Sequence, residues 1–181
     1  MIRLQSEIEN CLQTIRNTNN KEQNFQGRLY AYFMKFEKEG YVVEMETNIK
    51  DIPNISHLDN YSKKEIDILI YKKDYSEKYA IELKWTYDPG FHYLDKLEEY
   101  KKDVVFVRQL VQFANFNETC SVIVMDTNPN HLTNPSENRI NKEEEKLYEE
   151  GSICGECFGK RKILYGAYEY IIIPFKKSVK Y

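Results

Sequence analysis

The chain of 181 residues, 41% of them hydrophobic and 14% aromatic, can bury one sizeable core and is too short for two comfortable domains. No window reaches the apolar length of a membrane span, and residues 1–7 lack the apolar run of a secretory signal, so we expect a single cytoplasmic domain. A formal net charge of −3, from 26 Lys and Arg against 29 Asp and Glu, excludes a chain that is basic overall, so any phosphate-binding surface must be a local patch.

Two helices and a strand are predicted in the first 46 residues. Apolar residues spaced by four and then three predict a short amphipathic helix between Ile2 and Arg16. Asn20 is a suitable N-cap for a second helix, which carries a run of aromatic residues and leucine and stops at Gly40. Residues 41–46 follow as a strand.

The centre of the chain predicts a β-hairpin. Residues 64–71 and 78–85 are rich in β-branched and aromatic residues, and a polar stretch separates them. Because successive side chains on a strand point to opposite faces, Glu82 and Lys84 share one face of the second strand. Asp67 on the first strand can then converge with them.

The second half of the chain predicts a long helix and further strands. Residues 94–113 carry apolar side chains at threes and fours, a stripe suited to packing on a sheet. Residues 121–125 form a nearly continuous apolar run, typical of a strand buried on both faces. A charged, helix-prone stretch at 141–150 precedes a final strand at 168–173. The fold class we expect is α/β, with a central mixed β-sheet flanked by helices.

Asp67, Glu82 and Lys84 are the residue types that hydrolysis of a phosphodiester requires. Carboxylate oxygens suit Mg²⁺ or Mn²⁺, and the backbone carbonyl of Leu83 between them is a plausible third ligand. Lys84 would place a compact positive charge near the scissile phosphate or the attacking water. The alternative is that charged residues alternating with apolar ones on a strand simply face solvent.

The order of these elements around Asp67 and Glu82-Leu83-Lys84 resembles the PD-(D/E)xK nuclease superfamily over about residues 21–126. The resemblance implies a restriction-endonuclease-like core in one domain of residues 1–181, with an N-terminal helix and a C-terminal extension outside the core. It also implies that Asp67 and Glu82 bind metal and that Lys84 is the catalytic lysine. Glu22 on the first core helix, with Gln26 one turn later, matches a further carboxylate position. Ile66 stands where many members have proline before the first acid.

The activity that the resemblance implies is that of a Mg²⁺- or Mn²⁺-dependent DNA endonuclease. Restriction or defence against foreign DNA is the most natural setting, and repair or recombination is another. Homodimerisation would fit cleavage of two strands. Two alternatives stay open. The first is a non-catalytic nucleic-acid- or protein-binding module on the same fold. The second is a zinc-dependent interaction protein organised by Cys154 and Cys157, whose remaining ligands would have to come from Cys11, Cys120 or a histidine.

Overall fold

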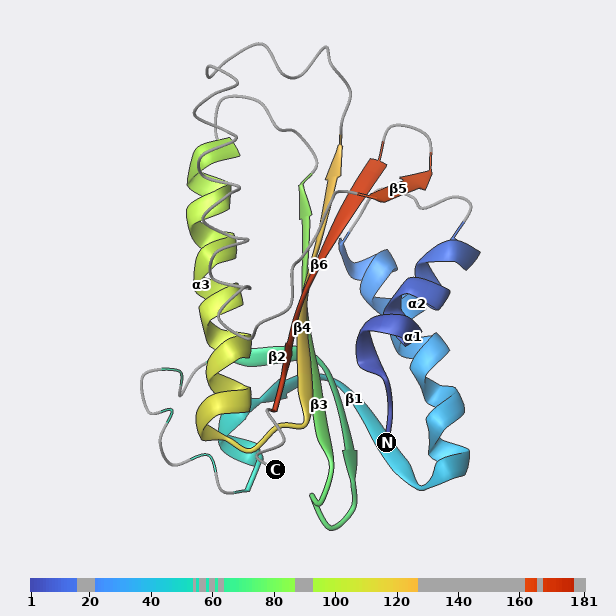
Figure 1. Ribbon diagram of the computed structural model, residues 1–181, viewed down its shortest axis with the longest axis vertical. Coiled ribbons are helices and arrows are strands. Elements are labelled where there is room, and N and C mark those ends of the chain that lie inside the picture. Colours follow the sequence, from blue (N-terminus) through green and yellow to red (C-terminus); the bar gives the residue numbers. More distant parts are fainter. Residues whose placement is uncertain are drawn as a thin grey trace.

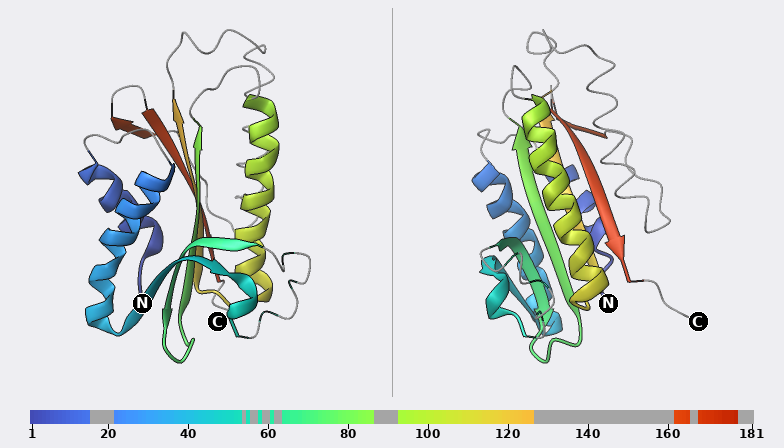
Figure 2. Two further views of the ribbon diagram at one scale, coloured as in Figure 1. Left: turned by 180° about the vertical axis from the view of Figure 1, so that it is seen from behind. Right: turned by 90° about the vertical axis from the view of Figure 1, so that its left-hand side faces the viewer.

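The structure is a computed structural model that describes residues 1–15, 22–53, 55, 58, 61, 64–86, 93–126, 162–165 and 168–177. In this described part a mixed sheet of six strands lies between two helical layers, with α1 and α2 on one face and α3 on the other (Figure 1). The view from behind shows the same arrangement (Figure 2). The helices are α1 (Leu4–Thr14), α2 (Glu22–Phe33) and α3 (Tyr93–Phe113), with 3-10 turns η1 (Met34–Glu39) and η2 (Ile49–Asp51). The strands are β1 (Tyr41–Asn48), β2 (Glu65–Lys72), β3 (Lys78–Thr86), β4 (Glu118–Asp126), β5 (Lys162–Tyr165) and β6 (Tyr168–Lys176).

The expected α/β class with a mixed sheet flanked by helices is confirmed. The strand order is β1-β2-β3-β4-β6-β5. Strands β2 and β3 are antiparallel, as the hairpin prediction required. Strand β1 is antiparallel to β2, and β6 is antiparallel to both β4 and β5. Strands β3 and β4 are parallel and are joined through α3, because a parallel pair needs a crossover connection. The right-hand view of Figure 2 shows α3 running alongside these two strands.

The helices end and pack as their sequences dictate. In α1 the buried residues follow the predicted apolar stripe, and Glu118 at the start of β4 accepts hydrogen bonds from the Leu4 and Gln5 amides at the first turn. The helical run that contains α2 and η1 ends at Gly40, whose φ of 81° is the left-handed conformation that glycine adopts without strain.

The sheet separates two hydrophobic clusters. One lies under α1 and α2 and includes Ile81 and Leu83 of β3, with Trp85 packed against it. The other lies under α3 and includes Ala80 and the buried face of that helix. The odd-numbered residues of β3 therefore face α1 and α2, so the predicted alternation along this strand is confirmed.

Some sequence predictions were incomplete or fall beyond the described ranges. The short strand β5 was not predicted, and β4 and β6 are longer than expected. Asn20, the stretch 141–150 and the pair Cys154 and Cys157 lie outside the described residues. Across the described part of the chain, no helix combines the length and the apolar character needed to cross a membrane.

Candidate functional site

The site lies where the β2–β3 hairpin opens. Strand pairing between β2 and β3 stops at Ile68 opposite Ile81, and continuing the register would place Asp67 opposite Glu82. Instead the start of β2 runs across the sheet toward α3 (Figures 1 and 2). The Asp67 carboxylate occupies the opening, and its Oδ2 accepts a 2.6 Å hydrogen bond from the Leu83 amide. A side chain thus satisfies a backbone donor that a continued ladder would have paired.

Helix α2 supplies two more side chains to the opening. The Trp85 amide donates to Glu22 Oε2 at 2.9 Å, and Gln26 Nε2 donates to the Asp67 carbonyl at 3.0 Å. Gln26 is buried, so this bond prevents the desolvation cost of an unpaired amide and an unpaired carbonyl. The structure therefore places Glu22 and Gln26 beside Asp67 and β3, next to the three residues of the motif.

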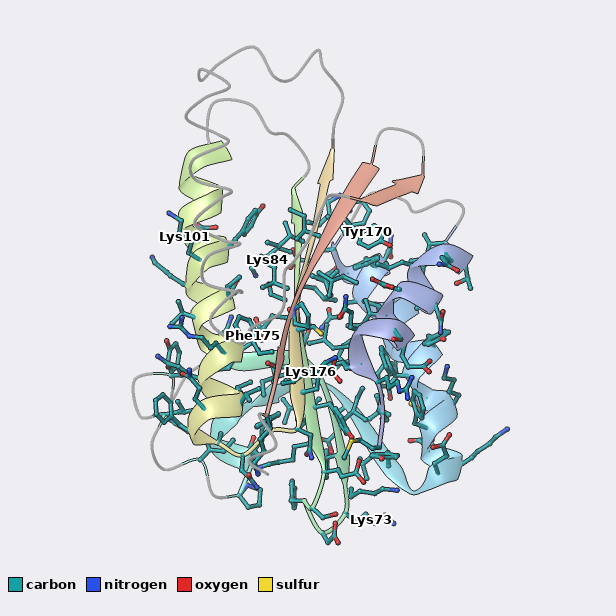
Figure 3. All side chains as sticks on the ribbon, in the orientation of Figure 1. Lys73, Lys84, Lys101, Tyr170, Phe175 and Lys176 are labelled. Atoms are coloured by element: carbon teal, nitrogen blue, oxygen red, sulfur yellow. The ribbon has the colours of Figure 1, made fainter. Side chains whose placement is uncertain are left out.

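On the opposite side of the opening, α3 and the residue before β2 contribute an ion-pair network. Lys64 Nζ lies 2.8 Å from Glu82 Oε2 and 2.6 Å from Asp103 Oδ1. The second oxygen of Asp103 lies 3.3 Å from Lys84 Nζ. Lys84 is on the α3 side of β3 (Figure 3). One carboxylate on α3 therefore bridges two lysines that come from different parts of the chain.

Sequence reasoning did not assign Lys64 and Asp103 to the site. In the sequence Lys64 stands out as the start of a strand and as part of the basic pair Lys63-Lys64, one of several candidate patches for phosphate. Asp103 is easier to find from the sequence, because it lies on the apolar stripe of α3, three residues after Tyr100 and four before Val107. A carboxylate at such a position is rarely buried without a charged partner, which predicts a lysine or arginine facing it.

Burial dominates the electrostatics of the two motif carboxylates. Glu82 is only 1% exposed, so the alternative in which these charges simply face solvent is wrong for this residue. Its burial, with the nearby Asp67 charge, raises the pKa of Glu82 to about 8, although Lys64 acts in the other direction. Burial also raises the pKa of Asp67, opposed by the Leu83 hydrogen bond and by Lys84. For both acids, burial therefore opposes ionisation of the carboxyl group.

For the two lysines, the neighbouring carboxylates outweigh the effect of burial on the pKa. Burial lowers the pKa of Lys84, but the carboxylates of Asp103, Glu22 and Asp67 outweigh it, and the net pKa is raised. For Lys64 the same burial effect is outweighed by Glu82 and Asp103, so its pKa is also raised. Both side chains are consequently ammonium ions at neutral pH.

The opening has the donor chemistry for a hard divalent cation. Glu82 Oε1 has no hydrogen-bond partner among the described residues and is shielded from solvent, a costly state that a bound cation would relieve. Because the N–H and C=O of a strand residue face the same edge, the Leu83 carbonyl faces the opening with the amide that Asp67 binds. In the described ranges no three side chains of the His, Cys, Asp and Glu types form a group that could hold a metal. Asp67, Glu82 and the Leu83 carbonyl would offer two carboxylates and a carbonyl, a set that suits Mg²⁺ with its retained waters.

Cys11 and Cys120 do not join this site. Both are buried cysteines in the cluster beneath α1 and α2. Burial raises the pKa of Cys11 to about 11, which disfavours the thiolate that a zinc ligand requires. Comparisons of the chain with protein-family models, with curated proteins and with solved structures found no match.

Proposed function

We propose that the protein is a metal-dependent DNA endonuclease with a restriction-endonuclease-like core of the PD-(D/E)xK kind. The observation that carries the proposal is the buried carboxylate of Glu82, which has an oxygen with no hydrogen-bond partner among the described residues. It lies where the hairpin opens, near enough to Asp67 for the Asp67 charge to raise its pKa. Two carboxylates in such a place are costly unless a cation compensates them. The lysine that phosphodiester hydrolysis needs, Lys84, is on the same face of β3.

Each side chain has a role in the proposed reaction. Asp67 and Glu82, with the Leu83 carbonyl, would hold Mg²⁺ or Mn²⁺, which when bound supplies Lewis acidity and a water of lowered pKa. The raised pKa of Lys84 favours a role as a positive charge that steadies the transition state over one as a base. Gln26 fixes the backbone of Asp67 through its carbonyl, and Glu22 fixes the backbone of Trp85 through its amide. We expect in-line attack by water and products with a 5′-phosphate.

DNA is the proposed partner, and restriction or defence against foreign DNA is the proposed setting. Two copies of the chain, each with one such site, would cut both strands of a duplex. Linear product that appears without accumulation of nicked circles would support this homodimeric arrangement.

A second candidate is a module on the same fold that binds nucleic acid or protein without cutting it. The ion-pair network favours this candidate, because Lys64 and Lys84 already compensate Glu82 and Asp103 without a metal. The net charge of −3 also gives no overall attraction to a polyanion.

Plasmid cleavage with Mg²⁺, Mn²⁺ or EDTA distinguishes the two candidates. Wild type is compared with Asp67→Ala and Lys84→Ala, and the matched controls are Asp51→Ala and Lys38→Ala, which replace exposed residues of the same types. We expect metal-dependent nicking or linearisation that both site variants lose and both controls keep. Absence of cleavage of duplex, single-stranded and branched DNA by the folded wild type, with either metal, would reject the nuclease in favour of the binding module.

A further inference from the structure

Lys64 lies next to the motif residues without belonging to the motif. Its ammonium is held by Glu82 and Asp103 on two sides, and it lies 5.3 Å from the centre of the Phe106 ring. The Tyr61 ring packs on Phe106 with 5.0 Å between the ring centres, so aromatic side chains support the lysine. Lys64 is therefore placed by two carboxylates and an aromatic ring, which fixes a side chain that is otherwise flexible.

Two properties make this ammonium available to a ligand. Its side chain is 26% exposed, in contrast to the nearly inaccessible Glu82 beside it. An ammonium has three donors, and a divalent cation that bound Glu82 would compete for one of the two carboxylates that Lys64 contacts. The ammonium would then stay paired with Asp103, directly beside the cation and the phosphate bound to it.

The charge of the site also calls for a second lysine. The carboxylates around the opening are Glu22, Asp67, Glu82 and Asp103. Against these four negative charges, Lys84 and one divalent cation supply three positive charges, which would leave a net negative site that repels a phosphodiester. Lys64 brings the balance to zero before the substrate binds.

We propose that Lys64 is a second phosphate-contacting lysine of this site and that Asp103 is the positioning residue that holds Lys64 and Lys84 together. The proposal rests on the proposed nuclease function. In it, Lys64 donates to a non-bridging oxygen of the scissile phosphate and supplies part of the positive charge that a second metal ion would bring in a two-metal site. Asp103 acts only through the two lysines.

The test combines cleavage with a binding measurement that needs no chemistry. Lys64→Met, Lys64→Arg, Asp103→Asn and the exposed control Lys38→Met are compared with wild type. Cleavage rates are measured at saturating Mg²⁺, and affinity for a short DNA duplex is measured in Ca²⁺ over a series of salt concentrations. Urea unfolding in EDTA establishes that each variant is folded.

For Lys64→Met we expect a loss of kcat on the order of 10- to 100-fold and a decrease of about 1 in the salt slope of duplex binding. Lys64→Arg should keep the salt slope, because its charge is retained. Asp103→Asn should lower kcat more than it changes affinity, since it removes the carboxylate that aligns both lysines. Lys38→Met should match wild type in both measurements.

The outcomes separate this inference from the function on which it rests. If wild type cleaves DNA and Lys64→Met keeps its kcat and salt slope while losing only stability in EDTA, Lys64 merely neutralises Glu82 and the inference is overturned. If wild type binds but does not cleave, and Lys64→Met still loses one unit of salt slope, the nuclease is rejected and the phosphate contact stands. A wild type that neither cleaves nor binds overturns both.

Discussion

Glu82→Gln should stabilise the metal-free protein, and the gain should grow with pH. The pKa of Glu82 is about 8 in the folded protein, and its ordinary value of 4.5 applies in the unfolded chain. Between these values the native state keeps a proton that the unfolded chain has released, so the free energy of unfolding falls as pH rises, by about 1.4 kcal/mol per pH unit. The stability that the protonated carboxyl contributes is fully present below pH 4.5 and is lost toward pH 8. Integrated from pH 5 to pH 9, the loss is about 4 kcal/mol.

The glutamine keeps the shape of the side chain and cannot ionise, so the variant should lack this loss. Urea unfolding in EDTA can be followed at several pH values through the fluorescence of Trp85, which is the single tryptophan of the chain. Glu37→Gln is the matched control, because Glu37 is an exposed acid on η1. The difference in unfolding free energy between Glu82→Gln and wild type should increase with pH, whereas that between the control and wild type should stay nearly constant.

Mg²⁺ should restore the stability that the wild type loses as pH rises. A cation that binds ionised Glu82 displaces the bound proton, so below pH 8 its affinity should rise with pH, by about tenfold per unit for one displaced proton. Glu82→Gln should lose most of this stabilisation. Parallel pH profiles for wild type and Glu82→Gln in EDTA would refute the argument that an ionisable carboxyl is buried at the opening. A small slope left in the variant is expected from Asp67, whose pKa burial also raises.

Three further predictions concern the framework of the site. Gln26→Leu should lower the free energy of unfolding by about 1–3 kcal/mol, because the Asp67 carbonyl loses its donor; urea unfolding measures this, and an unchanged midpoint would mean that water replaces the amide. Gly40→Ala should cost about 1 kcal/mol from its φ of 81°, visible as a lower Tm, and a stabilised variant would contradict the left-handed turn. Glu118→Gln should cost about 1 kcal/mol by weakening the cap on the Leu4 amide; amide exchange in the first turn of α1 should then accelerate, and unchanged exchange would exclude the cap.

The sequence was informative wherever side-chain periodicity decides the structure. Alternation along residues 78–85 predicted which side chains of β3 share a face, and the apolar stripe of 94–113 predicted α3 almost to the residue. The spacing of residues along α2 also placed Gln26 one turn after Glu22, and both reach the opening. These features depend on local geometry alone.

Features that depend on tertiary packing could not be predicted in this way. A period of two indicates a strand but not where its pairing stops, so the opening at Asp67 was invisible in the sequence. The contact between Lys64 and Asp103 joins residues 39 apart in sequence and depends on how α3 docks on the sheet. The four-residue strand β5 is too short for its pattern to stand out from the neighbouring residues.

The two helical layers have a consequence for how the protein folds. Glu22 comes from the layer on one face of the sheet and Asp103 from the layer on the other, yet both contact the same end of β3. A chain that has docked only α2 would hold Asp67 without aligned lysines, and one that has docked only α3 would hold the lysines without the amide of Gln26. The complete constellation therefore forms only when both layers are in place. Partly folded chains, during synthesis or after stress, would lack the complete site, so the proposed activity is restricted to the finished molecule.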